Sequence, residues 1–484
     1  MSSIKKQLFS GVFYTALSKY SGIVVSLIVT AILARLLSPD DFGVVAIASV
    51  VISFFNIFTD IGLSAAIIQH KNLSKQDLSD LFTFTFWCGI ILAGGFFILS
   101  IPIANYYEHS ILSNICKILS VNLFFSSVSI VPNALFYKNK EFRYIAIRSL
   151  SIQFAGGIFS VVFALLGGGI YALLINPVLS CILLFIISIK RYPQRLSLFF
   201  NISPIRKIFS YSVYQFLFGT IVYFSRNLDK LLIGKYLNMT ALGYYEKSYR
   251  LMMLPLQNIT QVITPVMHPI LSDLQDDKRQ LTSAHEKIVK ILAAIGFPLS
   301  VFLFFSAREI ILFLFGEQWI PSISVFQILS LSVGMQIVLS SSGSIFQAAG
   351  DTKSLFVCGL FSALINTIGI LLGVFYFKTL DAIAISINIT VLLGFIQSYI
   401  YMYVVTLKQS IYPFIKLFVL PLIISLVFVI VFFIINHYTA HINIVISLSI
   451  KSLIFVIIWG IYIQYTGIYD VKNRITKLVS HQSK

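Results

Sequence analysis

The feature that most constrains this chain is a series of apolar runs that recurs along almost its whole length. Each run is about 20 residues long, enough for a helix to cross the ~30 Å hydrocarbon core of a bilayer. The runs are continuous and do not alternate with polar residues, which argues against a membrane β-barrel. Because 58% of the 484 residues are hydrophobic and only 11% are charged, we expect an all-α polytopic membrane protein.

The apolar runs predict about 14 transmembrane helices. Their expected ranges are 11–34, 42–67, 81–104, 112–136, 145–166, 169–189, 210–234, 243–270, 288–306, 322–348, 354–376, 382–406, 412–435 and 443–465. A basic, proline-containing stretch divides the chain. We therefore expect a six-helix lobe at 1–190, a cytoplasmic linker at 191–209, a second six-helix lobe at 210–406, and two accessory helices with a cytoplasmic tail at 407–484.

The two expected lobes resemble each other at an offset of 200 residues. Phe9-Ser10 aligns with Phe209-Ser210, and Phe42-Gly43 aligns with Leu242-Gly243. Six helices separate the copies, and this even number gives both lobes the same orientation in the membrane. The pattern predicts a pseudo-twofold axis along the membrane normal, a common plan among transporters.

The basic residues predict the orientation of the chain. Lys and Arg gather in alternate turns and near both termini, whereas the opposite loops carry only Arg35, Lys235, Arg308 and Lys378. By the positive-inside rule, both termini lie in the cytoplasm. The formal net charge of +17 therefore reflects membrane topology and does not indicate nucleic-acid binding.

A charged run interrupts the apolar stretch 210–234. Arg226, Asp229 and Lys230 lie at i, i+3 and i+4, so they share one helix face. Each charge at the centre of a membrane helix costs about 2.5–3.5 kcal/mol, so the three side chains should face water or partners inside the protein. An internal salt bridge through Asp229 is one interpretation. One cation remains over, which favours a site for an anion.

A second charged group opens the expected helix 243–270. Glu246 and Arg250 form an i, i+4 pair, and Lys247 lies beside Arg250. Neighbouring tyrosines leave two interpretations. The group is either a helix end at the membrane interface, with snorkelling cations, or part of a cationic cavity.

Further ionisable residues lie within the apolar runs. Lys117 is a cavity candidate, Lys19 and Arg148 either line a cavity or snorkel to the interface, and Lys451 belongs to an accessory helix, where helix packing or a lipid headgroup is the expected contact. For an ion-coupled transporter, the carboxylates that could act as counter-ions or coupling groups are Asp60, Asp229, Glu246 and Asp381.

Several stretches closely resemble bacterial polysaccharide exporters, in the right order and spacing. They are Ala34–Gly43, Asp60–Gln69, Asn133–Lys138, Asn227–Gly234 and Phe346–Asp351. The chain thereby resembles the polysaccharide transport branch, with its Wzx-type flippases, of the multidrug/oligosaccharidyl-lipid/polysaccharide exporter superfamily. That family has two six-helix lobes around a central cavity, often with two further helices.

The resemblance implies a function. Such a protein flips undecaprenyl-pyrophosphate-linked oligosaccharide repeat units across the bacterial inner membrane, for O-antigen, capsule or exopolysaccharide assembly. Proton or sodium coupling and a polysaccharide polymerase partner are further implications, and no cofactor is expected. A cationic cavity would suit the pyrophosphate. Its candidate residues are Arg226, Lys230, Lys117, Lys247, Arg250, Arg148 and Lys19, with Asp229, Glu246 and Asp60 as counter-ion or coupling groups.

Three other functions compete with this interpretation. A lipid II flippase would share the cationic cavity, whereas a drug/cation antiporter would need an acidic one. A membrane-embedded polysaccharide polymerase or glycosyltransferase generally needs a large loop or a catalytic domain, and no expected loop here exceeds roughly 20 residues. The four cysteines all fall in apolar runs, and the sequence contains neither a CxxC motif nor a Gly-x-x-x-x-Gly-Lys-Ser/Thr motif.

The predicted topology can be tested by cysteine-accessibility labelling in intact cells. Single cysteines at positions 200 and 480 should resist a membrane-impermeant reagent until the membrane is opened, because both positions are expected in the cytoplasm. Strong labelling of either position from outside would overturn the topology.

Overall fold

The computed structural model of the chain describes residues 2–60, 62–70, 73–197, 223–275, 277–439 and 441–466, and these residues form helices and turns with no strand. Among the described residues, 11 helices are long and apolar enough to cross a membrane. The number is 12 if α13 (Ser322–Ser330) and the helical residues Val333–Ala348, bent by 44° between them, make one span. The expectation of an all-α polytopic fold is confirmed.

The two remaining expected helices are also accounted for. One is α10 (Met239–Ser272), a helix of 34 residues that carries Glu246, Lys247 and Arg250 near its start. The other is the helix expected at 210–234. Its residues 210–222 lie outside the described part of the chain, and the described residues 223–236 are helical. The described helices therefore follow the expected series of about 14 spans.

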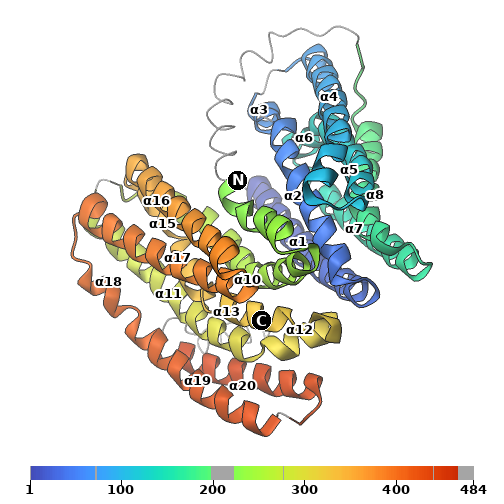
Figure 1. Ribbon diagram of the computed structural model, residues 1–484. Helices are drawn as coiled ribbons and strands as arrows, with labels where there is room; N and C mark the ends of the chain where they lie inside the picture. The colour runs from blue at the N-terminus through green and yellow to red at the C-terminus, as the bar shows by residue number, and fades with distance from the viewer. Residues whose placement is uncertain are drawn as a thin grey trace, which may run out of the picture. The chain divides into compact units, whose positions relative to one another are not determined.

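The chain divides into two compact units, Met1–Gly243 and Tyr244–Lys484. In the first unit the helices run side by side as a bundle (Figure 1). Its elements are α1 (Ser2–Leu36), α2 (Pro39–Thr59), α3 (Leu63–Gln69), α4 (Lys75–Tyr107), α5 (Ile111–Val128), α6 (Ile130–Lys138), α7 (Phe142–Leu165), η1 (Gly169–Tyr171), α8 (Ala172–Arg191), the helical residues 223–236 and the first turn of α10.

The second unit is a bundle in which α19 and α20 run together along one edge (Figure 1). The elements after α10 and their bounds are α11 (Lys278–Phe305), α12 (Ala307–Phe315), η2 (Glu317–Trp319), α13, α14 (Val333–Leu339), α15 (Ser342–Ala348), α16 (Thr352–Leu371), η3 (Leu372–Phe377), α17 (Leu380–Tyr401), η4 (Met402–Leu407), α18 (Tyr412–Lys416), α19 (Val419–Thr439) and α20 (Ile444–Tyr465). The accessory helices expected at 412–435 and 443–465 are thus α18–α19 and α20.

One expected loop is in fact largely helical. The sequence predicted a loop at 271–287, but α11 already begins at Lys278. The Asp277 side chain caps this helix by accepting hydrogen bonds from the backbone N–H groups of Arg279 and Gln280. These contacts hold the pKa of the Asp277 carboxyl below its usual value, led by the Gln280 N–H group. The prediction was wrong because hydropathy detects the apolar part of a helix and misses its polar first turns.

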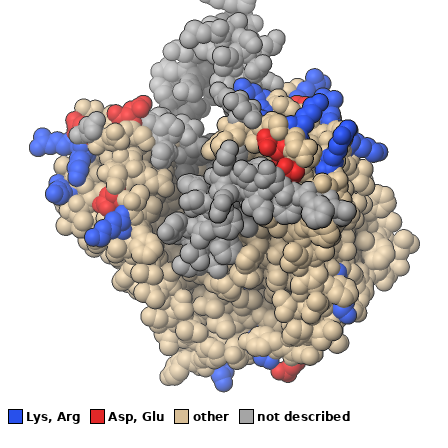
Figure 2. Space-filling view, turned by 90° about the horizontal axis from the view of Figure 1, so that it is seen from above, with Lys and Arg blue, Asp and Glu red and all other residues tan. Residues whose placement is uncertain are grey.

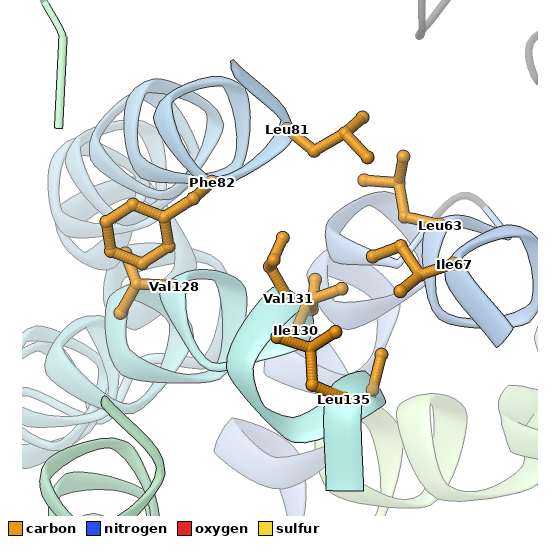
Figure 3. Close-up of a cluster of buried hydrophobic side chains, with 9 residues drawn as sticks. Leu63, Ile67, Leu81, Phe82, Val128, Ile130, Val131 and Leu135 are labelled. Carbon is orange, nitrogen blue, oxygen red and sulfur yellow. The ribbon is translucent and has the colours of Figure 1, made fainter. Parts of the chain in front are cut away.

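A buried apolar cluster joins the short helices of the first unit to its long ones (Figure 3). Leu63 and Ile67 of α3 contact side chains of α4 and α6 there. The cluster consists of Leu63, Ile67, Leu81, Phe82, Val128, Ile130, Val131, Ala134 and Leu135. It holds α3 and α6 in place although each has fewer than ten residues.

Both units tie the start of one helix to the end of the next in a similar way. In the first unit the Tyr192 hydroxyl, just after α8, donates a 2.5 Å hydrogen bond to Glu141 at the start of α7. In the second, the Thr406 hydroxyl in η4 donates a 2.7 Å bond to Asp351, the N-cap of α16. Each bond closes the fifth and sixth helices of one lobe into a pair.

Residues 200 apart make a reciprocal contact within the first unit. A Cβ atom on Gly43 would lie 1.8 Å from the carbonyl oxygen of Met239, and one on Gly243 would lie 2.0 Å from that of Pro39. The first turns of α2 and α10 therefore cross backbone against backbone, which only glycine permits. The Thr240 hydroxyl donates to Asp40 across this crossing, at 3.1 Å.

We predict that Gly43→Ala or Gly243→Ala destabilises the protein by about 1–3 kcal/mol, because a methyl group must push two backbones apart. Gly94→Ala is the matched control, since nothing lies within 4 Å of a Cβ atom there, and it should leave stability unchanged or raise it. Thermal unfolding in detergent would measure all three. Similar melting temperatures would show that the crossing is not constrained.

Candidate functional site

The helical residues 223–236 carry the charged run and are fixed within the first unit. The Tyr223 hydroxyl donates to the carbonyl of Val50 in α2, and the Tyr107 hydroxyl donates to the carbonyl of Leu231 at 3.3 Å. The ring of Phe54 contacts those of Tyr223 and Phe224, with centroids 6.0 and 5.2 Å apart. The segment therefore packs on α2 and on the end of α4.

The three charged side chains of this segment differ in exposure. Asp229 is 4% exposed, and its carboxylate accepts a 2.9 Å hydrogen bond from the backbone N–H of Lys230. Lys230 is half-buried and Arg226 is exposed. The arrangement is a buried carboxylate flanked by two more accessible cations. The carboxylate can moderate the repulsion between the two cations and leave them able to contact an anion.

An ion pair joins the end of this segment to the turn after α4, and a second ionic contact joins that turn to the start of α2. Lys235 Nζ lies 2.7 Å from Glu108 Oε1 and 5.1 Å from the ring centroid of Tyr106. The hydrogen bond from Lys235 holds the pKa of the exposed Glu108 carboxyl below its usual value. His109 Nε2 lies 3.4 Å from Asp40 Oδ2. Asp40, which also accepts the Thr240 hydroxyl, is thereby a polar group at the glycine crossing.

The second charged group lies at the start of the second unit. Lys247 is buried at 3% exposure, with its Nζ 5.6 Å from the ring centroid of Phe315 and 5.8 Å from that of Trp319. Aromatic faces attract cations at such distances. Glu246 is half-buried and Arg250 is exposed. Lys247 therefore packs into an aromatic pocket, whereas Arg250 is accessible.

Arg148 of α7 lies inside the helix packing of the first unit. It is 5% exposed and donates to Ser188 Oγ of α8 at 2.9 Å and to Asn133 Oδ1 of α6 at 2.8 Å. Its guanidinium lies 4.5 Å from the ring centroid of Phe136. The side chain thus joins three helices through neutral partners.

The remaining candidates are dispersed over the first unit. Lys117 of α5 is half-buried, with Nζ 5.7 Å from the ring centroid of Phe97. Lys19 of α1 is also half-buried. Asp60 is exposed at the C-cap of α2 and accepts a 2.9 Å hydrogen bond from the Ser64 N–H, so it caps α3. Of the candidates, the structure brings Arg226, Asp229 and Lys230 together on one segment.

Lys and Arg side chains gather in groups on the face shown in Figure 2, where broad areas carry neither basic nor acidic residues. The basic residues that end or begin helices fit this distribution, among them Lys138 of α6, Arg143 of α7 and Arg191 of α8. The positive charge of the chain is therefore concentrated at helix ends, as expected for helices that cross a membrane.

A buried ion pair was missed in the sequence. Lys451 of α20, at 0% exposure, places Nζ 2.5 Å from Glu309 Oε1 of α12 and 2.9 Å from the carbonyl oxygen of Phe305. The Ser447 hydroxyl donates to the same carboxylate oxygen at 2.9 Å. Helix packing was one of the two roles expected for Lys451, but its partner Glu309 was not identified, because nothing in the sequence links residues so far apart.

The sequence matches the family described as "Polysaccharide biosynthesis protein" over residues 32–324. The chain is 25% identical over 380 residues to the lipopolysaccharide biosynthesis protein WzxC of Escherichia coli K12, covering 77% of this chain and 76% of that protein. It is 27% identical over 351 residues to an uncharacterized membrane protein in the cps region of Klebsiella pneumoniae, covering 72% of each.

Two solved structures show the same fold. The lipid II flippase MurJ in an inward closed conformation has a TM-score of 0.74 at 17% identity, covering 94% of this chain and 98% of that one. An inward-facing multidrug resistance MATE family transporter has a TM-score of 0.62 at 14% identity, covering 80% and 95%. The all-helical fold of the chain is therefore the fold of these two structures.

We predict that Lys451→Met destabilises the protein by about 3–5 kcal/mol, because it leaves the Glu309 carboxylate buried without its cation. The double variant Lys451→Met/Glu309→Gln should recover most of this loss, since no uncompensated charge remains. Lys290→Met, which removes an exposed lysine of α11, is the control. Equal melting temperatures for the single and double variants would refute a stabilising ion pair.

Proposed function

Because this chain belongs to the polysaccharide biosynthesis protein family, we propose that it is a flippase for lipid-linked oligosaccharides. Its substrate would be an undecaprenyl-pyrophosphate-linked repeat unit, moved across the bacterial inner membrane by alternating access. Two relatives, WzxC and the succinoglycan biosynthesis transport protein ExoT of Rhizobium meliloti, carry names that fit this role. The protein is then a transporter and not an enzyme.

The observation that carries the proposal is the charged run within an apolar helix. Arg226 and Lys230 lie one turn apart with Asp229 buried beside them. Cations retained in an apolar segment, against their cost in a bilayer, are expected to serve an anion. The pyrophosphate of a polyprenyl carrier is a polyanion that Arg and Lys can bind with charge-assisted hydrogen bonds.

We propose different roles for the other candidate residues according to their exposure. Arg250, Lys117 and Lys19 are accessible enough to contact substrate and are proposed to widen the cationic surface. Lys247 and Arg148 are buried against rings and neutral oxygens, so we propose that they add positive potential without direct contact. Their effect would then appear as weaker substrate binding and not as a loss of selectivity.

We further propose the lobe boundaries and the orientation. The lobes comprise residues 1–190 and 210–406, joined by a linker at 191–209, with residues 407–484 as accessory helices and tail. Both termini lie in the cytoplasm, in agreement with the basic residues at the ends of α6, α7 and α8. We propose that a polysaccharide polymerase receives the repeat unit that the flippase releases. Membrane lipids surround the transmembrane helices of the flippase.

A drug/cation antiporter is the weaker alternative, because the described spans hold more accessible cations than carboxylates. Of the proposed counter-ion and coupling groups, Asp60 caps α3 and Asp229 lies beside Lys230, while Glu246 follows the start of α10. A lipid II flippase would share the cationic chemistry. Direct comparison of a lipid II probe with a repeat-unit probe would separate these two substrates.

We predict that Arg226→Gln/Lys230→Gln abolishes flipping in reconstituted vesicles while folded protein persists. The two substitutions keep polarity and approximate length but remove both charges that would hold the pyrophosphate. The assay follows a fluorescent undecaprenyl-pyrophosphate-linked sugar between leaflets, beside a melting curve of the same protein.

The matched control is Lys75→Gln/Lys353→Gln, which removes two exposed charges at helix starts. This variant loses the same net charge as Arg226→Gln/Lys230→Gln. It should flip the probe at the wild-type rate, because neither lysine belongs to the proposed binding site. Normal flipping by Arg226→Gln/Lys230→Gln would show that the charged run is a structural salt bridge and does not bind the substrate.

A further inference from the structure

A buried histidine in the second unit lies outside the proposed substrate site. His285 of α11 is seven residues from the helix start, about 10 Å along its axis. Its side chain is 0% exposed. Its ring stacks on Tyr399 of α17, with centroids 6.0 Å apart and planes inclined by 23°. An ionisable residue at such a position within a membrane span calls for a functional explanation.

The histidine contacts a break in a helix. Ser340 and Ser341 separate α14 from α15, and His285 Nε2 lies 3.2 Å from Ser341 Oγ. The Ser341 hydroxyl also donates to the carbonyl of Val338 at 2.8 Å and lies 3.3 Å from the Tyr399 hydroxyl. Interrupted helices at such polar contacts are where transporters commonly bind coupling ions.

The hydrogen-bond network favours one tautomer of the neutral ring. Ser341 and Tyr399 both direct their hydroxyl hydrogens to the Val338 carbonyl, at 2.8 Å in each case. In that arrangement the Ser341 oxygen is left as an acceptor, which favours the tautomer with the hydrogen on Nε2 of His285. Nδ1 is the unprotonated nitrogen, and it is buried with no hydrogen-bond partner among the described residues.

The surroundings of the ring offer little charge. The neighbouring α13, α14 and α15 contain no Asp, Glu, Lys, Arg or His. The only carboxylate next to the ring in sequence is Glu286, whose Oε1 lies 3.5 Å from the Tyr403 hydroxyl. The other titratable groups on the elements packed around α11 and Tyr399 are Lys278, Arg279, Lys287 and Lys290 on α11, Arg308 and Glu309 on α12, Lys353 and Cys358 on α16, Asp381 and Tyr401 on α17, Tyr412 and Lys416 on α18, His437 and Tyr438 on α19, and Lys451, Tyr462 and Tyr465 on α20.

We propose that Nδ1 of His285 is a proton-binding site that couples flipping to a proton gradient, an inference that rests on the proposed function. A proton binds the Nδ1 lone pair on one side of the membrane, giving an imidazolium with two N–H donors. It leaves the same atom on the other side, so the ring returns unchanged.

The geometry links this proton to a movement. The imidazolium has one acceptor, Ser341 Oγ, and its second N–H needs another. The nearest break in the backbone is the α14–α15 junction, where Val338 already accepts two hydroxyl hydrogens. Protonation therefore favours a different arrangement of this junction, in which a carbonyl turns to the ring. The junction is the two-state element that the proton biases.

The test uses full-length protein in vesicles with a fluorescent undecaprenyl-pyrophosphate-linked sugar, with and without a pH difference. One proton per cycle permits at most about tenfold accumulation for each unit of pH difference. His285→Gln keeps a polar side chain but cannot take the proton, so accumulation should disappear while exchange of the probe without a gradient persists. His437→Gln, an exposed histidine of α19, should accumulate the probe like the wild type.

Several outcomes overturn the proposal. One is accumulation of the probe by His285→Gln when a pH difference is present. Another is that His285→Gln also loses exchange of the probe without a pH difference, which would mean that His285 has a structural role. A wild type that flips the probe but ignores the gradient also overturns it and leaves the flippase function standing. A wild type that does not flip the probe refutes the proposed function itself.

A second variant covers the case in which His285→Gln does not fold. Ser341→Ala removes the acceptor of the Nε2 hydrogen, a contact that favours the charged ring more than the neutral one. The pH midpoint of the flipping rate should then move to lower pH. An unchanged midpoint would overturn the proposal.

Discussion

The structure depends on one constraint, the absence of hydrogen-bonding partners in hydrocarbon. A polar side chain within a span is therefore stabilised mainly by partners in another part of the protein. Three buried cations meet this requirement in three ways. Arg148 uses the neutral oxygens of Ser188 and Asn133, Lys451 uses the carboxylate of Glu309, and Lys247 lies near aromatic rings. Each solution joins different helices, so the buried charges also decide which helices pack together.

The same constraint explains why small residues lie where α2 and α10 cross. Apolar side chains gain little by leaving lipid for protein, so close van der Waals contact must hold the helices together. The crossing at Gly43 and Gly243 brings two helix starts together, and helix starts carry partial positive charge. Asp40 lies at this point and accepts a hydrogen bond from Thr240. Its negative charge stabilises both helix starts and offsets their mutual repulsion.

Hydropathy predicted the spans well because each apolar run has to match the thickness of one bilayer. It could not predict where spans break, as at Ser129 between α5 and α6, since a break removes few apolar residues. For the site, the residue types and their helical spacing placed Arg226, Asp229 and Lys230 on one segment. The sequence could not show that Lys247 lies against Phe315, because a partner distant along the chain leaves no local pattern.

The two halves share a plan but differ in the chemistry of their buried polar groups. The first half holds a guanidinium at Arg148, which stays protonated at any physiological pH. The second half holds an imidazole at His285, the type of side chain whose ordinary pKa lies nearest to neutral pH. A fixed charge supplies constant potential, whereas a titratable group responds to its surroundings. In the proposed mechanism, fixed cations such as Arg148 add to the attraction of the anion, and His285 takes up the coupling proton.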